Sequence, residues 1–188
     1  VRRQEETIYR RKLRLTNPAV ARYRDLILYN LEAGQAVLTD NNDVQIYTDG
    51  KEKFQALLRE MRGAKKYIHF QYYIIRNDEL WQHIEPVLIQ KAREGVEVRI
   101  LFDSMGCRGM RNRDWERLEC EGIHVAEFFP ALLGKLQLRM NYRNHRKIVV
   151  IDGRVGFVGG FNVGREYLGM DEKKFGYWRD THLRIEGA

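Results

Sequence analysis

Two spacings of apolar residues alternate along most of this chain. Segments in which apolar residues recur every three or four positions predict helices that bury one face, at residues 51–62, 79–94 and 112–120. Short segments rich in β-branched and aromatic residues predict strands between them, at residues 44–47, 67–75, 96–102 and 123–128. Strands that alternate with helices favour an α/β domain whose sheet is largely parallel in this half.

The C-terminal third predicts a different strand arrangement. Asp152 and Gly153 separate two apolar segments, residues 147–151 and 154–158, and an Asp-Gly pair in this position is a strong hairpin signal. A last strand is expected at residues 181–185. Because a hairpin is antiparallel, the predicted fold class is α/β with a mixed sheet.

The N-terminal segment has another character. Residues 1–15 carry six basic residues and few apolar ones, which predicts a charged helix or arm. Basic residues also collect beside membrane spans on the cytoplasmic side, so a juxtamembrane position is an equal alternative. Asn17 and Pro18 predict a helix start, with Asn17 as the cap, and this helix is expected to stop near Gly34.

The composition fits one globular domain. The chain has 188 residues, of which 44% are hydrophobic and 31% charged, and this excludes a disordered protein. We therefore expect a basic helical arm at residues 1–33 and a single domain at residues 34–188. The net charge of +7 suits anionic partners such as nucleic acid or an acidic membrane surface, with ordinary solubility charge as an equal alternative.

Two further features bear on the class of protein. No run of about 18 apolar residues exists, so no membrane-spanning helix is predicted within this sequence. Cys107 and Cys120 follow neither a disulfide framework nor a metal-ligand spacing. They are expected to be buried, reduced thiols.

The candidate chemistry centres on His145 and Lys147. Alternate residues of a strand point to the same side, so the imidazole is expected beside the ammonium. Four apolar residues follow Lys147, and a lysine in such surroundings usually needs an anionic partner. A phosphoryl group is such a partner, and an imidazole can attack it. The pair therefore predicts chemistry on a phosphate.

Other candidates follow in the hairpin. Gly159 and Gly160 close its second strand and allow a backbone to approach another group closely. The Asn162 amide can donate a hydrogen bond to a phosphate oxygen. Asp152 lies at the far end of the strand, about 16 Å from His145. We therefore interpret Asp152 as a structural turn residue.

Asp180 is the third candidate catalytic residue. A nucleophilic histidine needs one free ring nitrogen and an acceptor that holds the proton of the other. A carboxylate does this best, and Asp180 directly precedes the last predicted strand. A surface Asp180 paired with Arg179 is the alternative. His182 shares a face with Asp180 and is expected to be accessory.

These residues resemble the signature of the phospholipase D superfamily, His-x-Lys-x-x-x-x-Asp followed by a Gly-Gly-x-Asn stretch. The resemblance to bacterial cardiolipin synthases extends over roughly residues 34 to 188. The segments that carry it are residues 71–78, 91–99, 141–148, 163–169 and 178–187.

This resemblance implies a mixed β-sheet sandwiched by α-helices, with residues 34–188 as the first catalytic half-domain. It implies phosphatidyl transfer between two phosphatidylglycerol molecules, through a phosphohistidine, to give cardiolipin and glycerol without a metal or cofactor. Lys147 and Asn162 then stabilise the phosphoryl oxygens, and Asp180 supports the imidazole. Many members carry Ser where Gly160 stands, so one donor is missing here. His145 is either the nucleophile or the general acid.

The resemblance also implies partners. We expect anionic phospholipid, a membrane surface, and either the missing second half of the same chain or a homodimer mate, because relatives carry two motifs and this chain carries one. The chain begins at Val1 without the membrane spans of its relatives, so we expect a fragment of a bacterial membrane protein whose catalytic part faces the cytoplasm. The apolar segment 128–136 is hypothesised to line the lipid entrance, with core packing as the alternative.

Two rival functions stay open. Small nucleases of the superfamily carry one motif per chain and complete their site by homodimerisation, and the net charge of +7 suits that class. Nucleic acid is nevertheless not expected, because the segments around Arg143 and Trp178 resemble cardiolipin synthases. The other alternative is an inert half-site that only binds anionic lipid, since the second histidine is absent from this chain.

Overall fold

The computed structural model describes residues 17–36, 38–39, 41–129 and 143–187. The chain divides into two compact units, residues 1–42 and 43–188. The boundary therefore follows Asn42, whereas the sequence analysis set it after residue 33. The basic segment at residues 1–15 and most of the hypothesised lipid-entrance loop lie outside the described residues.

The first unit contains helices α2 (Pro18–Ala21) and α3 (Arg24–Gly34). The Asn17 side chain accepts a hydrogen bond from the Ala19 amide at 2.9 Å, and Pro18 occupies the first turn, so the predicted cap is confirmed. Two helices stand where one was expected. None of the described helices in the chain is long and apolar enough to cross a bilayer.

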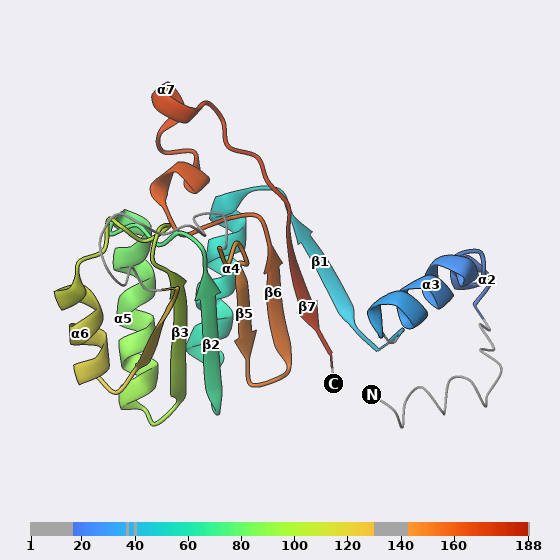
Figure 1. The fold of residues 1–188 in the computed structure, drawn as a ribbon, viewed down its shortest axis with the longest axis horizontal. Coiled ribbons are helices and arrows are strands. Elements are labelled where there is room, and N and C mark those ends of the chain that lie inside the picture. Colours follow the sequence, from blue (N-terminus) through green and yellow to red (C-terminus); the bar gives the residue numbers. More distant parts are fainter. Residues whose placement is uncertain (1–16, 37, 40, 130–142, 188) are drawn as a thin grey trace. The chain divides into compact units, whose positions relative to one another are not determined.

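The second unit is built on a seven-stranded sheet with the order β1-β7-β6-β5-β2-β3-β4 (Figure 1). Strands β2, β3 and β4 run parallel, and the other neighbours pair antiparallel. The predicted α/β class with a mixed sheet is confirmed. The strands are β1 (Asp43–Tyr47), β2 (Tyr67–Tyr72), β3 (Glu97–Asp103), β4 (His124–Phe128), β5 (Ile148–Ile151), β6 (Val155–Gly159) and β7 (His182–Glu186).

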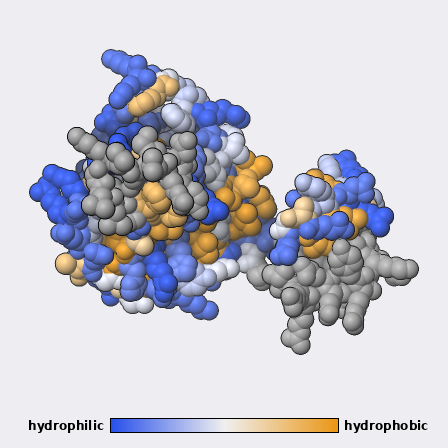
Figure 2. All heavy atoms as spheres, viewed as in Figure 1, coloured by the Kyte–Doolittle hydropathy of each residue, from blue (hydrophilic) through white to orange (hydrophobic). Residues whose placement is uncertain are grey.

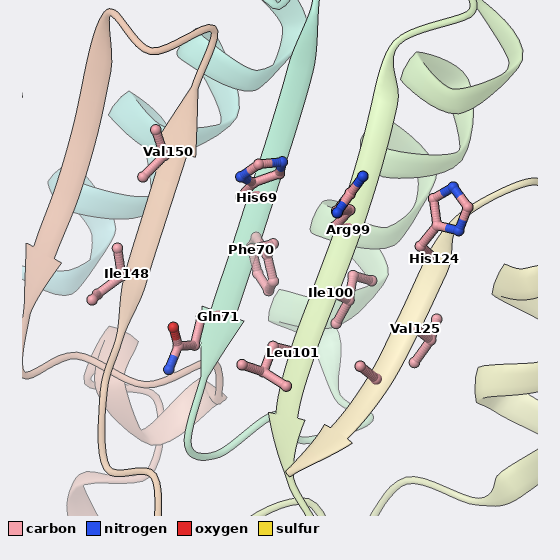
Figure 3. A pocket seen from close by; sticks show the side chains of 11 residues that line it. His69, Phe70, Gln71, Arg99, Ile100, Leu101, His124, Val125, Ile148 and Val150 are labelled. Carbon is pink, nitrogen blue, oxygen red and sulfur yellow. The ribbon is translucent and has the colours of Figure 1, made fainter.

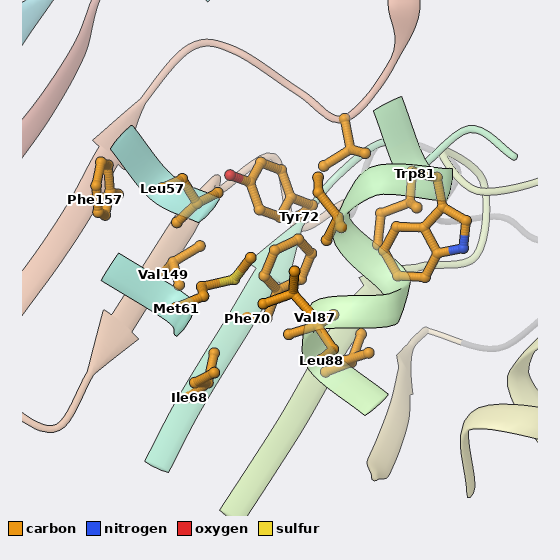
Figure 4. Packing of buried hydrophobic residues seen from close by; sticks show 14 of the residues in the cluster. Leu57, Met61, Ile68, Phe70, Tyr72, Trp81, Val87, Leu88, Val149 and Phe157 are labelled. Atoms are coloured by element: carbon orange, nitrogen blue, oxygen red, sulfur yellow. The ribbon is translucent and has the colours of Figure 1, made fainter. Parts of the chain in front are cut away.

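Three helices, α4 (Gly50–Gly63), α5 (Glu79–Arg93) and α6 (Asn112–Cys120), cover one face of this sheet (Figure 1). Their buried stripes meet alternate residues of the strands, and the largest fully buried side chains include Trp81 of α5 and Phe70 of β2 (Figure 4). This layer is the hydrophobic core, and it holds the strands in one register.

The opposite face of the sheet is open in the described residues. Val44, Ile46 and Val158 lie there with 52%, 64% and 39% of their surface exposed. A pocket of about 620 Å³ lies on this face, and Figure 3 shows the residues that line it on strands β2 to β5, with the helices behind the sheet. None of the candidate site residues lines this pocket.

Two short elements between β6 and β7 were not predicted. They are the 3₁₀ helix η1 (Arg165–Leu168) and α7 (Glu172–Phe175). Each contains four residues, which is too short for a helical spacing of apolar residues to be recognised. Together they make the connection that leaves the sheet and returns to it at His182.

Candidate active site

The candidate residues meet at one edge of the sheet. Strands β2, β3 and β4 end at this edge, and because β5 and β7 run antiparallel to β2 and β6, both begin there. The register pairs Ile148 with Gln71 and with Val158, so the residues just before β5 lie beside the end of β2 and of β6. The topology therefore brings together segments that are far apart in the sequence.

His145 and Lys147 lie side by side at this edge. The Lys147 Nζ atom is 2.9 Å from Nδ1 and 3.2 Å from Nε2 of the His145 ring, and it donates to the His145 carbonyl at 2.8 Å. Tyr73, which follows β2, contacts both residues. Its ring centroid is 4.5 Å from that of His145 and 5.3 Å from Nζ of Lys147.

The two side chains differ in exposure and in protonation. His145 is exposed, whereas Lys147 is buried. Partial burial and then the charge of Lys147 lower the pKa of His145, and Asp103 acts against them. Burial lowers the pKa of Lys147 to about 8, and the carboxylate of Asp180 acts against it. At neutral pH the site thus holds an accessible, unprotonated imidazole beside a largely protonated amine.

Asp103 is a site residue that the sequence analysis missed. It is the last residue of β3, and its side chain is fully buried. One carboxylate oxygen accepts from the Asn144 amide at 3.1 Å, and the other accepts from the Met105 amide at 2.9 Å. Asp103 therefore fixes the backbone next to His145. Its negative charge also raises the pKa of the His145 ring.

Asp180 lies against Gly160. A Cβ atom at Gly160 would stand 1.9 Å from the nearer carboxylate oxygen of Asp180, so the absence of a side chain at position 160 makes room for that carboxylate. Asp180 also accepts from the Thr181 amide at 2.7 Å and acts electrostatically on Lys147. Among the described hydrogen bonds, none joins Asp180 to His145.

Asn162 ties two elements together at the same edge. Its Oδ1 accepts from the Ile74 amide at 3.1 Å, and its Nδ2 donates to the Tyr167 hydroxyl at 2.8 Å. The side chain is buried. A primary amide has two N–H groups, so one N–H remains for a further acceptor.

Asp152 lies at the other end of β5, in the hairpin turn with φ 55°. Its carboxylate accepts from three backbone amides, those of Lys65, Lys66 and Tyr67, at 2.8, 2.8 and 2.9 Å. Burial opposes ionisation, but these amides hold the pKa of Asp152 below its usual value. Asp152 thereby connects the hairpin to the start of β2.

Two further nitrogen-bearing side chains, Lys53 and His182, are buried in this unit. Lys53 of α4 is fully buried, donates to the Tyr72 hydroxyl at 2.7 Å and has its pKa lowered well below its usual value by burial. His182 is also fully buried, and neither ring nitrogen has a hydrogen-bond partner among the described residues. Burial, then the charges of Lys53 and Lys147, lower the pKa of His182 to about 2. His182 is therefore neutral.

The position of Lys53 in the sequence already indicates that it is buried. It stands one residue before Phe54 and four before Leu57, so it falls within the buried stripe of its helix. A lysine in an apolar stripe needs a polar partner, and Tyr72 of the adjacent strand supplies one. Among the described residues, no three His, Cys, Asp or Glu side chains are grouped to hold a metal ion.

The cysteines differ from the expectation in one respect. Both are free, and Cys107 is buried, but Cys120 at the end of α6 is exposed. Burial raises the pKa of the Cys107 thiol to about 12.

Comparisons with known proteins agree with this arrangement. Residues 57–174 match the family described as "Cardiolipin synthase, PLD-like domain". A cardiolipin synthase from Staphylococcus aureus (strain Mu50) is 55% identical over 172 residues, covering 92% of this chain and 35% of the relative. The major cardiolipin synthase ClsA from Bacillus subtilis (strain 168) is 48% identical over 188 residues, covering 100% of this chain and 39% of the relative. The chain thus spans less than half the length of these curated relatives.

Solved structures share the fold at low sequence identity. Phosphatidylserine synthase from Haemophilus influenzae is 20% identical, with a TM-score of 0.60, over 77% of this chain and 33% of that one. Nuc from Salmonella typhimurium, a phospholipase D family member, is 17% identical, with a TM-score of 0.54, over 78% of this chain and 84% of that one. The family match covers more than half of the sequence, and the chain belongs to the phospholipase D-like domain family of cardiolipin synthases.

Proposed function

We propose that this chain supplies one half of the active site of a cardiolipin synthase. The enzyme would transfer a phosphatidyl group from one phosphatidylglycerol to another and release glycerol. The observation that carries the proposal is the contact of 2.9 Å between the exposed His145 imidazole and the buried Lys147 amine, in a chain 55% identical to a cardiolipin synthase. The negative charge of a phosphodiester would pair with the buried ammonium of Lys147.

In the proposed reaction, a ring nitrogen of His145 attacks the phosphorus of the first phosphatidylglycerol. The bond between phosphorus and the headgroup glycerol oxygen breaks, and that oxygen takes a proton from a second histidine outside this chain's motif. A headgroup hydroxyl of another phosphatidylglycerol then attacks the phosphohistidine, gives up its proton to the second histidine, and frees His145. We assign His145 as the nucleophile because its lowered pKa keeps it unprotonated at neutral pH.

The surrounding residues would stabilise the charge that develops on phosphorus. In this proposal the Lys147 ammonium and the remaining N–H of Asn162 would donate hydrogen bonds to the nonbridging oxygens. Asp180 would keep Lys147 protonated, because its carboxylate raises the pKa that burial lowers. In this proposal Asp103 and Tyr73 position the imidazole, and Asp152 is structural.

The proposal includes partners and a location. One His-x-Lys motif cannot supply both the nucleophile and the general acid, so the second histidine would come from the rest of a longer chain or from a second copy. The substrate would be an anionic phospholipid at the surface of a bacterial membrane, with the site on the cytoplasmic face. Alone, this chain would have negligible turnover.

The decisive experiment is mass analysis of the full-length enzyme, quenched with acid-free denaturant during turnover of phosphatidylglycerol. We expect a phosphatidyl group on His145, and none in a His145→Asn variant, which should lose about 10⁴-fold or more in transfer rate. Asn keeps a polar side chain without the nucleophilic ring, and near-ultraviolet circular dichroism checks that the variant is folded. A covalent group on another residue, with His145 unmodified, would contradict the assignment.

A phosphodiesterase acting on nucleic acid is the second candidate, favoured by the net charge of +7 and the single motif. A homodimer would then complete the site. Assays of single- and double-stranded DNA cleavage beside lipid transfer separate the two. Cleavage of DNA that depends on His145, without any cardiolipin formation, would replace the lipid proposal.

A further inference from the structure

The connection between η1 and β7 contains a group of exposed apolar and aromatic side chains. Met170, Phe175 and Tyr177 have 48%, 40% and 64% of their surface exposed. They belong to residues 170–177, which contain α7 and which we call the tip. Figure 1 shows the tip projecting beyond the sheet edge that carries the site, and Figure 2 shows an apolar group among hydrophilic residues there.

Basic side chains accompany these apolar ones. Lys173 and Lys174 are exposed, and neither takes part in an ion pair among the described residues. The Nζ atom of Lys174 lies 5.0 Å from the centre of the Phe175 ring. The tip also holds two acidic residues, Asp171 and Glu172, so its four charged side chains sum to zero. Asp171 pairs at 3.1 Å with Arg165, which also pairs with Glu79, so Lys173 and Lys174 are the cations that the tip itself offers to an external anion.

A chain of aromatic contacts connects the tip to the site. The Phe175 ring lies 6.3 Å from that of Trp178, and the Trp178 ring lies 4.7 Å from that of Tyr167. Tyr167 in turn accepts the hydrogen bond from Asn162. The tip is therefore connected by direct side-chain contacts to Asn162, which is assigned to bind phosphate.

We propose that the tip is a membrane contact that seats the active site on an anionic phospholipid surface. Exposed aromatic and apolar side chains flanked by lysines are the composition that enters the interfacial region of a bilayer, where the lysines meet lipid phosphates. The alternative occupant is protein, but lysines are depleted from the buried parts of protein interfaces. This inference rests on the proposed function and adds how the enzyme reaches a lipid substrate.

Site-directed fluorescence tests the contact. An environment-sensitive fluorophore is attached in the full-length enzyme to Tyr177→Cys, with Cys120→Ser and with cysteines outside this chain replaced. Cys107 is buried and stays unlabelled. The matched control carries the label on the natural Cys120, which is exposed on α6. Vesicles contain phosphatidylglycerol or phosphatidylcholine, with or without a spin-labelled quencher near the headgroup.

We expect the tip label to shift to shorter wavelength and to be quenched in phosphatidylglycerol vesicles, while the label on Cys120 changes little. Equal quenching of both labels, or none at the tip, would overturn the proposal. A tip label that is already shielded before lipid is added would show that protein covers this surface, which also overturns it. Equal quenching in phosphatidylcholine would remove the anionic specificity.

A charge variant separates this proposal from the proposed function. Lys173→Gln with Lys174→Gln should lower transfer in phosphatidylglycerol vesicles about tenfold or more, since each lysine near an anionic surface contributes about fivefold to binding. Transfer with short-chain phosphatidylglycerol dissolved as monomers should not change. An equal loss of transfer activity on vesicles and on monomers would contradict the membrane contact. A wild-type enzyme that forms no cardiolipin from either substrate, with quenching intact, would instead refute the proposed function.

Discussion

The two ends of strand β5 carry residues of the same short sequence motif, yet they differ in almost every physical respect. At the start of the strand, Lys147 is buried beside an exposed imidazole, and burial lowers its pKa to about 8. At the other end, Asp152 is bound by three backbone amides that hold its pKa down. At one end the Lys147 amine forms no ion pair among the described residues and can still bind an anion, whereas at the other end backbone amides of the fold bind Asp152. Adjacency in a motif therefore does not imply a shared role.

The largest effect on activity should follow from removing the amine of Lys147. Lys147→Met in the full-length enzyme should lower the rate of phosphatidyl transfer by about 10²–10³-fold, because the variant loses stabilisation of the developing phosphoryl charge. Thermal stability should not fall, since a buried amine is replaced by an apolar side chain of similar length. Steady-state kinetics and thermal unfolding measure the two effects.

Lys91→Met is the matched control for this variant. Lys91 is also buried, but it lies in α5 and contacts the Arg62 carbonyl and Glu94. It should retain transfer activity. A similar rate loss in both variants would mean that Lys147 acts through the fold, and the contrast between the ends of β5 would disappear.

The second effect is a shift in pH dependence. Transfer by the wild type should decline as the pH rises through about 8, because Lys147 then loses its proton. The Asp180 carboxylate raises that pKa, so Asp180→Asn should move the alkaline limb of the pH–rate profile to lower pH. Measuring kcat/KM across the pH range, with Asp114→Asn on α6 as the control, tests the sign of the shift.

An alternative role for Asp180 gives a different profile. If Asp180 instead held the proton of the His145 ring, Asp180→Asn would lower the rate at all pH values and would move the acid limb. An unchanged alkaline limb in Asp180→Asn would therefore contradict the assignment to Lys147.

The smallest effect on activity should follow from changing Asp152, at the far end of β5. Asp152→Asn should leave the transfer rate of the folded enzyme within about twofold, but should lower the free energy of unfolding by about 2 kcal/mol, because hydrogen bonds to a charged acceptor are lost. The stabilisation by Asp152 should be present above the usual carboxyl pKa of 3.8 and be lost as the pH falls through the lowered value. Denaturant unfolding at several pH values measures this.

Asp49→Asn is the control for the stability measurement. Asp49 caps α4 with a single side-chain hydrogen bond to an amide, that of Glu52 at 3.0 Å. Asn caps a helix about as well as Asp, so this change should cost much less, about 0.5 kcal/mol or below. A strong loss of transfer rate in Asp152→Asn, with the fold intact, would show that Asp152 takes part in the chemistry and would contradict its structural role.

Long and short elements of the fold differ in how clearly the sequence predicts them, for physical reasons. Helices and strands of the sheet were predicted to within a residue or two at most boundaries, because their apolar spacing reports burial on one face. Strand β2 was predicted to reach residue 75 but ends at Tyr72, since the chain leaves the sheet toward the site there. The four-residue elements η1 and α7 have too few positions to show a spacing.

The sequence predicts those site residues that are neighbours along the chain, but not those that the fold brings together. His145 and Lys147 are two residues apart in the segment that leads into β5, so local chain geometry alone brings them together. Asp103 meets Asn144 across 41 positions, through the pairing of strands that the sequence does not state. Its position after a buried strand was the available signal, but the register that directs it to His145 exists only in the folded sheet.

The contact between Gly160 and Asp180 couples two positions that lie far apart in the sequence. A side chain at position 160 would occupy the space of the carboxylate, which stands 1.9 Å from where the new Cβ would be. Introducing a serine hydroxyl there, as an additional donor for the substrate, would displace the acid that helps to keep Lys147 protonated. Residues 160 and 180 must therefore be changed together in any redesign of this site.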